Sequence, residues 1–163
     1  MTVHLRPARD EDAPAVAAVW VSAWRDGHLG HVPDELVAVR TPESFRIRAA
    51  AMIARTTVAL SDAGITGFVT VSGDEVEQVF VAAPGRGSGV AGALLGEAER
   101  QVAAAGHETA WLAVVAGNAR ARRFYERSGW SDSGPFDYAA PAAGGAVSVP
   151  CHRYVKSVVA ARG

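Results

Sequence analysis

The segment at residues 75–92 constrains the fold of this chain most, because it passes from a strand pattern to a helix pattern through a glycine-rich loop. Its first part, residues 76–81, is mostly β-branched or aromatic, which is typical of a strand. An Ala-Pro-Gly turn ends that strand, the loop Arg-Gly-Ser-Gly follows at residues 86–89, and an apolar helical pattern begins directly after it. The sequence therefore predicts a strand, a tight loop and a helix in immediate succession.

A helix that starts directly after such a loop is suited to binding an anion. Its first N–H groups have no partners within the helix, and the helix dipole favours a negative charge there. Glycine lets the backbone turn and approach a ligand closely. Residues 82–92 contain one arginine and no carboxylate. The loop is therefore predicted to hold a phosphate-like group.

The same glycines leave the kind of ligand open. Gly87, Gly89 and Gly92 match the G-x-G-x-x-G pattern of dinucleotide-binding loops. That kind of site also needs an acidic residue about 20 residues further on, to bind a ribose. The next predicted strand ends in Val-Ala-Gly-Asn at residues 115–118, without an acid, and no Lys-Ser or Lys-Thr pair makes a Walker A loop. Three hypotheses remain from the loop alone: a dinucleotide, another phosphate-bearing ligand, and a plain tight turn.

Length and charge limit the possible functions. The 163 residues favour a single domain over residues 1–163. A formal net charge of −1, without a basic run, argues against binding nucleic acid or an anionic membrane surface. Cys151 is the only cysteine, so neither an intrachain disulfide nor a thiolate metal cluster is expected. The charged N-terminal sequence and the absence of a long apolar segment predict no signal peptide and no membrane span, so a cytoplasmic location is expected.

Local patterns predict an alternation of helices and strands. The predicted elements are a strand at 3–6, a helix from residue 10 that Gly27 and Gly30 end, a helix after Thr41, strands at 56–60, 65–71 and 75–81, a helix from residue 90 to Gly106, a strand at 109–115, a helix from Asn118 to Gly129, and strands at 136–138 and 150–155. The strands at 56–60 and 65–71 are expected to form a hairpin. The low-complexity segment 139–145 is expected to be mobile.

Two motifs in this order of elements resemble the Gcn5-related N-acetyltransferase (GNAT) family. Residues 86–91, Arg-Gly-Ser-Gly-Val-Ala, resemble the family's pyrophosphate signature of Gln or Arg, x, x, Gly, x, and Gly or Ala. Residues 118–130, Asn-Ala-Arg-Ala-Arg-Arg-Phe-Tyr-Glu-Arg-Ser-Gly-Trp, are similar to its Asn-x-x-Ala-x-x-Phe-Tyr-x-x-x-Gly-Phe segment. Residues 24–33 resemble, more weakly, a branch of small bacterial members in which Tyr often replaces His28. Both main motifs at this spacing are far more specific than either alone.

The resemblance implies an α/β (α+β) fold. Its mixed, mostly antiparallel central sheet would have about six or seven strands, flanked by four helices and splayed between the fourth and fifth strands. Members of the family transfer an acyl group from an acyl-coenzyme A, here acetyl-CoA, to an amine. Pantetheine would lie in the splay like an added strand.

The resemblance also assigns the residues that hold the coenzyme. The backbone of Val79, Phe80 and Val81 would pair with pantetheine. The pyrophosphate would be held by N–H groups of Arg86, Gly87, Ser88, Gly89, Val90 and Ala91. Asn118 would bind the pantetheine arm while also capping its helix. Arg120, Arg122 and Arg123 are candidates for the 3′-phosphate, although an exposed helix face explains them equally well.

The catalytic candidates are Tyr125 and Glu75. A phenol at Tyr125 would protonate the departing thiolate, and the alternative for this residue is a core aromatic. An alkylammonium must lose a proton before it attacks, so a carboxylate or a water relay is needed. Glu75 and Glu77 share one face of their strand, and either is alternatively a solvated edge charge. Some family members use a glutamate at the position of Ala113, so their base is not carried over to this chain.

The acceptor pocket and the reaction path are predicted only in outline. Trp24, His28, His31 and Tyr138 are placed in the pocket by where the family binds acceptors, and the histidines show no metal-binding spacing. Direct transfer in a ternary complex is favoured, because Cys151 lies in a terminal strand away from the motifs. The alternatives are a non-catalytic acyl-CoA-binding module and a dinucleotide-dependent oxidoreductase. A homodimer is compatible with the resemblance, and the amine acceptor is not identified by the sequence.

Overall fold

The computed structural model describes residues 3–142 and 144–159. Its helices and strands are, in order, β1 (His4–Pro7), α1 (Ala13–His28), α2 (Asp34–Val39), α3 (Pro42–Met52), β2 (Thr56–Ser61), β3 (Gly64–Ser72), β4 (Glu75–Val81), α4 (Val90–Ala104), β5 (Thr109–Val115), α5 (Ala119–Arg127), β6 (Ser131–Ala142) and β7 (Gly145–Ser157). One-turn 3-10 helices lie at Asp10–Asp12, Ile53–Arg55 and Ala83–Gly85. No helix in these residues combines the length and the apolar character that crossing a bilayer requires.

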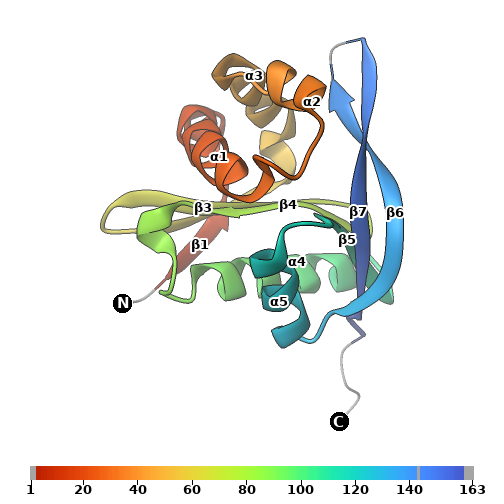
Figure 1. The fold of residues 1–163 in the computed structure, drawn as a ribbon. Coiled ribbons are helices and arrows are strands. Elements are labelled where there is room, and N and C mark those ends of the chain that lie inside the picture. The colour runs from red at the N-terminus through yellow and green to blue at the C-terminus, as the bar shows by residue number, and fades with distance from the viewer. Residues whose placement is uncertain (1–2, 143, 160–163) are drawn as a thin grey trace.

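A single seven-stranded sheet with the order β1-β2-β3-β4-β5-β7-β6 forms the middle layer. Helices α1, α2 and α3 lie on one face of the sheet, and α4 and α5 lie on the other (Figure 1). The neighbouring strands are antiparallel except for β4 and β5, which are parallel. The predicted mixed sheet is therefore confirmed. It differs from the parallel, doubly wound sheet that the dinucleotide hypothesis requires.

The described residues contain five α-helices, so the prediction of four was wrong. The additional helix is α2, whose six residues are too few to show a helical repeat in the sequence. The first predicted helix end was also imprecise, because Gly27 lies inside α1 and the chain turns at Gly30, with φ +85°. Gly27 is buried, and a Cβ there would lie 2.8 Å from Nδ2 of Asn118. This glycine therefore allows α1 to approach the end of β5.

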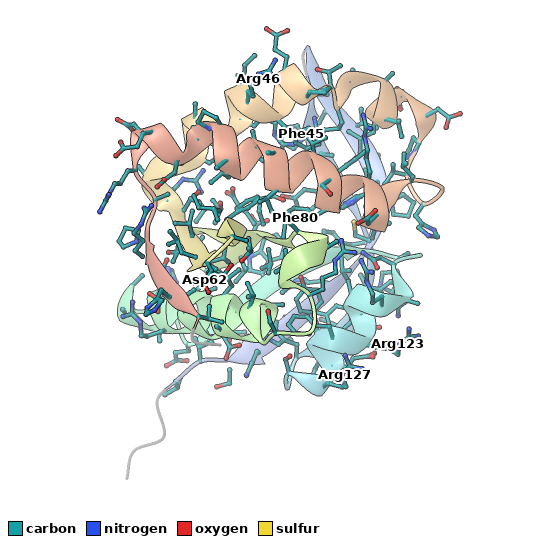
Figure 2. All side chains as sticks on the ribbon, turned by 90° about the vertical axis from the view of Figure 1, so that its left-hand side faces the viewer. Phe45, Arg46, Asp62, Phe80, Arg123 and Arg127 are labelled. Carbon is teal, nitrogen blue, oxygen red and sulfur yellow. The ribbon has the colours of Figure 1, made fainter. Side chains whose placement is uncertain are left out.

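Two hydrophobic cores lie on opposite faces of the sheet. The core beneath α1 and α3 is built around the fully buried Trp20, whose ring lies 5.2 Å from that of Phe45 and 5.6 Å from that of Phe68. Figure 2 labels Phe45 and Phe80, which both belong to this core. The opposite core contains Leu94 and Leu95 of α4 against the sheet. The two cores fix α1 and α4 on either side of β4.

The β4 and β5 strands diverge from a single point of contact. Their only register pair is Glu75 with Trp111. The Trp111 backbone N–H donates to the Asp74 carbonyl oxygen at 3.0 Å, and Nε1 of the same tryptophan donates to Oδ1 of Asp74 at 3.1 Å. Beyond this point the two strands separate toward their carboxyl ends. The backbone edge of β4 that faces β5 is therefore left without a strand partner.

A β-bulge reorients the side chains of β4. Thr70 of β3 pairs with Gln78, whereas the next residue, Val71, pairs with Val76, so Glu77 is an extra residue in β4. A bulge of this kind shifts the alternation of faces along a strand. As a result, Phe80 packs into the core beneath α1, on the side where Glu75 and Glu77 line a cavity.

The last two strands form a hairpin that is longer than predicted. β6 and β7 pair from Ser131 with Val155 to Ala142 with Gly145, and the hairpin extends past the sheet toward α2 and α3 (Figure 1). Of the segment 139–145 that was predicted to be mobile, residues 139–142 and 145 lie in these strands and residue 144 lies in the turn, while residue 143 lies outside the described residues. Residues 139–142 show no alternation of apolar and polar residues, so the sequence gives no strand signal there. Their backbone nevertheless pairs with β7, where Val147 and Val149 are buried.

Candidate active site

A cavity of about 890 Å³ opens where β4 and β5 separate. It reaches from the loop before α4, past the end of β5, to the space beneath α1 and α3. Most of the residues predicted to bind coenzyme or acceptor, or to act in catalysis, line it: Trp24, His28, Glu75, Val79, Phe80, Val81, Arg86, Gly87, Gly89, Val90, Ala91, Asn118, Tyr125 and Tyr138. The side chains of Ser88 and His31 are not part of this lining.

The glycine loop has the backbone geometry of an anion site. Gly87 and Gly89 have φ values of +78° and +83°, a conformation that residues with a side chain rarely adopt. A Cβ at Gly87, Gly89 or Gly92 would meet no atom within 4 Å, so the space in front of the loop is open. Gly89 is the N-cap of α4 and provides no side-chain cap. The first N–H groups of α4 are therefore available to a phosphate-bearing ligand.

The side chains of the loop support it rather than fill it. Nη2 of Arg86 donates to Oδ2 of Asp26 at 2.6 Å, which joins the loop to α1. The Ser88 hydroxyl donates to the Gly85 carbonyl oxygen at 2.5 Å. The loop is thus held from α1 and from within, while its backbone faces the cavity.

Asn118 lies where β5 ends and α5 begins. Its Oδ1 accepts a hydrogen bond from the Ala121 backbone N–H at 3.2 Å, so it is an N-cap of α5, as the sequence indicates. Its Nδ2 lies on the side of Gly27 in α1. The residue also lines the cavity, so its cap role leaves it in position for a ligand contact.

Tyr125 combines a packed ring with a hydroxyl that lacks a hydrogen-bond partner among the described residues. Its ring lies 5.3 Å from Phe124 and 6.1 Å from Tyr154, between α5 and the sheet. No side chain or carbonyl in the described part of the chain hydrogen-bonds to its hydroxyl, and the residue lines the cavity. Burial raises the pKa of Tyr125 to about 12. The phenol is therefore protonated at neutral pH and available as a hydrogen-bond donor.

Glu75 and Glu77 both line the cavity but have different partners. Oε1 of Glu77 lies 3.3 Å from Nη1 of Arg55 in an ion pair. Oε2 of Glu75 instead accepts a hydrogen bond from the Tyr138 hydroxyl at 3.0 Å. Burial raises the pKa of Glu75, and the hydrogen bond from Tyr138 partly opposes that rise. Glu75 is thus a carboxylate with a raised pKa and with no cation partner among the described residues.

His28 is held as a neutral imidazole. Its ring stacks on Trp24, with centroids 4.7 Å apart and planes at 8°, and its Nδ1 lies 2.9 Å from the Trp24 carbonyl oxygen. A carbonyl can only accept, so Nδ1 is the protonated nitrogen and Nε2 has the free lone pair. Burial lowers the pKa of His28 to about 4. His31, in contrast, lies against Gly117 on the exposed side of the loop after α1.

The structure adds three cavity residues that sequence reasoning missed. Arg40 follows the unpredicted α2, and Arg48 belongs to the polar part of α3, where no motif distinguishes it. Cys151 pairs in register with Val115 at the end of β5, so it lines the cavity despite its place in a terminal strand. Burial raises the pKa of the Cys151 thiol to about 11, so it is a thiol rather than a thiolate at neutral pH.

The arginines of α5 have separate surroundings. Arg120 and Arg127 line the cavity, and Arg123 is exposed on the outer side of the helix (Figure 2). Arg122 donates from Nε to the Tyr154 hydroxyl at 3.2 Å and from Nη1 to the Ala116 carbonyl oxygen at 3.0 Å. Arg122 therefore joins α5 to β7 and the end of β5, and is less available to a phosphate than Arg120 or Arg127.

Comparison with known proteins places this geometry among related structures. Residues 28–130 match the model of the acetyltransferase (GNAT) family. No curated protein matches the sequence. A GCN5-related N-acetyltransferase from Rhodopseudomonas palustris has 21% identity and a TM-score of 0.76, with 96% of each chain covered. The PaiA N-acetyltransferase from Thermoplasma acidophilum, solved with coenzyme A, has 18% identity and a TM-score of 0.71 over 96% of this chain and 99% of its own. An N-acetyltransferase from Staphylococcus aureus has 19% identity and a TM-score of 0.72, covering 97% and 99% respectively.

Proposed function

Because the chain belongs to the GNAT acetyltransferase family, we propose that it transfers an acetyl group from acetyl-CoA directly to a primary amine bound in the same cavity. The observation that carries this proposal is that Tyr125 and Glu75 both line the cavity that opens where β4 and β5 separate. A proton donor and a proton acceptor thus line the same cavity.

The cavity fits the coenzyme by its backbone. The open edge of β4 at Val79, Phe80 and Val81 offers N–H and C=O groups to the amides of pantetheine, as a partner strand would. The loop of Arg86 to Ala91 offers the uncapped N–H groups of α4 to the pyrophosphate. Asn118 supports the arm at the end of β5. When bound, acetyl-CoA supplies the acetyl group as an activated thioester.

The side chains then carry the protons. Glu75, directly or through a water molecule, takes a proton from the ammonium group, so that the amine nitrogen has a free lone pair. The nitrogen forms the new bond to the acetyl carbon as the bond from carbon to sulfur breaks, and it releases its second proton to solvent. Tyr125 gives its phenolic proton to the departing sulfur and recovers one from solvent. Trp24, His28 and Tyr138 form the wall against which the acceptor lies.

Initial-rate kinetics test this proposal. The release of coenzyme A thiol is measured while acetyl-CoA and an accepted amine are varied together. Direct transfer predicts intersecting double-reciprocal lines and unchanged turnover in Cys151→Ala, whose thiol is protonated and buried. Parallel lines with an inactive Cys151→Ala variant would instead show an acyl-cysteine route. Calorimetric binding of acetyl-CoA without transfer to any amine in a broad panel would favour the non-catalytic module.

The pH dependence tests the role of Glu75. In Tyr138→Phe we expect the acidic limb of the kcat/KM profile to move to higher pH. The Tyr138 hydroxyl stabilises the charged carboxylate and so lowers its pKa, and removing it raises the pKa of Glu75. A larger fraction of Glu75 is then protonated at a given pH, so kcat/KM begins to fall at a higher pH than in the wild type. A profile that shifts the opposite way, or Glu75→Gln with an unchanged acidic limb, would exclude Glu75 as the base.

A further inference from the structure

Two arginines line the part of the cavity beneath α1 and α3. Arg40 is the C-cap residue of α2 and Arg48 lies in α3, and both line the cavity. Neither guanidinium makes an ion pair or a hydrogen bond to any residue at positions 3–142 or 144–159. Arg48 lies 4.4 Å over the ring of Trp20, which orients it but does not neutralise it.

Neither carboxylate that lines the cavity forms an ion pair with Arg40 or Arg48. Glu77 pairs with Arg55 at 3.3 Å, and Glu75 accepts from Tyr138 at 3.0 Å. His28 is neutral at physiological pH and adds neither sign of charge. In this region a ligand would therefore meet two positive charges, at Arg40 and Arg48, and one carboxylate with a raised pKa, at Glu75.

Burial makes these two cations unusual. Arg40 is only 7% exposed, and a buried charge is unfavourable unless an opposite charge or hydrogen bonds compensate it. Burial lowers the pKa of both arginines; at Arg48 the charge of Arg40 lowers the pKa further, and the nearby Tyr138 and Glu77 oppose that shift. Both side chains line the same cavity, so their like charges disfavour each other. An anion between them would remove that repulsion and supply the missing partner.

The local fold holds both side chains in place. Thr41, between α2 and α3, caps α3 by accepting from the Ser44 backbone N–H at 3.1 Å. Arg40 thus follows one helix and Arg48 lies two turns into the next, so neither depends on a flexible loop. Guanidinium groups match a carboxylate through paired, parallel N–H donors, which a single ammonium cannot do.

We infer that the acceptor amine also bears a carboxylate, which Arg40 and Arg48 bind while its amino group faces Glu75. This inference rests on the proposed acetyltransferase function and narrows the acceptor to the class of amino acids. A polyamine would place a further positive charge near the guanidinium groups of Arg40 and Arg48, so a polyamine is disfavoured as the acceptor.

The first experiment compares matched acceptors with the wild-type protein. L-amino acids and their carboxamides are tested with acetyl-CoA, with rates expressed per free amine because amidation lowers the pKa of the amine. For the best amino acid we expect a kcat/KM about 30-fold or more above that of its amide, since hydrogen bonds to a charged group carry that difference. This comparison needs no variant and so does not depend on whether a substituted protein folds.

The second experiment assigns the effect to the arginines. Arg48→Met is expected to raise KM for the amino acid by about 30-fold and to leave the amide within about twofold. The matched control is Arg46→Met, which removes the same charge from an exposed position of the same helix (Figure 2) and should change neither substrate. Arg48→Lys should recover part of the loss, because it restores the charge without the planar fork.

The possible outcomes distinguish a failure of this inference from a failure of the proposed acetyltransferase function. Equal use of acid and amide, a preference for uncharged amines or polyamines, or an Arg48→Met loss shared by acid and amide would each overturn the inference while leaving acetyl transfer established. Failure of every amino acid as an acceptor would also overturn it. Absence of acetyl-CoA binding by calorimetry would instead remove the acetyltransferase proposal itself.

Discussion

Replacing Tyr125 with phenylalanine is expected to lower the kcat of acetyl transfer by about 10²-fold or more. The substitution removes only the hydroxyl, which lines the cavity and has no hydrogen-bond partner within the described residues. The ring contacts with Phe124, Trp130 and Tyr154 remain, so the fold should be unaffected. Because the phenol acts on the departing sulfur rather than on coenzyme binding, the Kd for acetyl-CoA should change by less than about twofold.

Tyr154→Phe is the matched control. Tyr154 is also a buried tyrosine near α5, but its hydroxyl accepts from Arg122 at 3.2 Å and donates to Glu126 at 3.3 Å. Its loss is expected to reduce stability by about 1 kcal/mol and to leave kcat intact. Stopped-flow or steady-state thiol release measures kcat, and calorimetry measures Kd. A Tyr125→Phe enzyme with the kcat of the wild type would reduce Tyr125 to a core aromatic and leave the proton to water.

Replacing Gly92 with glutamate is expected to weaken acetyl-CoA binding by about 10²-fold or more. Gly92 lies in the first turn of α4 and lines the cavity, and a Cβ there would meet no atom within 4 Å. A carboxylate at this position would lie where the pyrophosphate is proposed to bind, and would repel it. Its φ is not positive, so the side chain introduces no backbone strain of the kind expected at Gly87 or Gly89.

Gly96→Glu separates this effect from the stability of the helix. Gly96 lies four residues further along α4, on the same side of the helix, and its Cβ would also meet no atom within 4 Å, but it does not line the cavity. Both substitutions replace a glycine within α4 and should raise the melting temperature slightly. Calorimetry should show lost binding only in Gly92→Glu. Equal affinity in the two variants would place the pyrophosphate away from the start of α4.

Local patterns predicted most of the fold where a strong signal marks each element. The glycines of the loop, the Asn118 cap and the apolar side of α4 are visible in the sequence and lie as expected. Helix α2 has six residues and no repeat to detect. The alanines of β6 owe their strand to backbone pairing with β7, which is a tertiary effect that residue preferences do not record.

The sequence predicted the part of the site that is formed by motif residues. The residues placed by motifs at the ends of β4, β5 and α4 meet at the cavity, because the topology brings those ends together. The partners that come from distant elements were not visible. The extra residue at Glu77 depends on the pairing register of β3 and β4. The contact of Glu75 with Tyr138 and the approach of Arg40, Arg48 and Cys151 depend on how the β6–β7 hairpin and α2–α3 fold over the sheet.

The divergence of β4 and β5 has a consequence for solubility. An unpaired strand edge on the outside of a protein recruits other chains and promotes aggregation. Here the open edge lies in the interior of the sheet, α1 and α4 both contact β4, and the gap is closed at the Asp74–Trp111 end. A second polypeptide has no length of edge along which to align. The unpaired backbone groups of β4 are therefore accessible to a narrow ligand that carries amides, such as pantetheine, but not to the strand of another protein molecule.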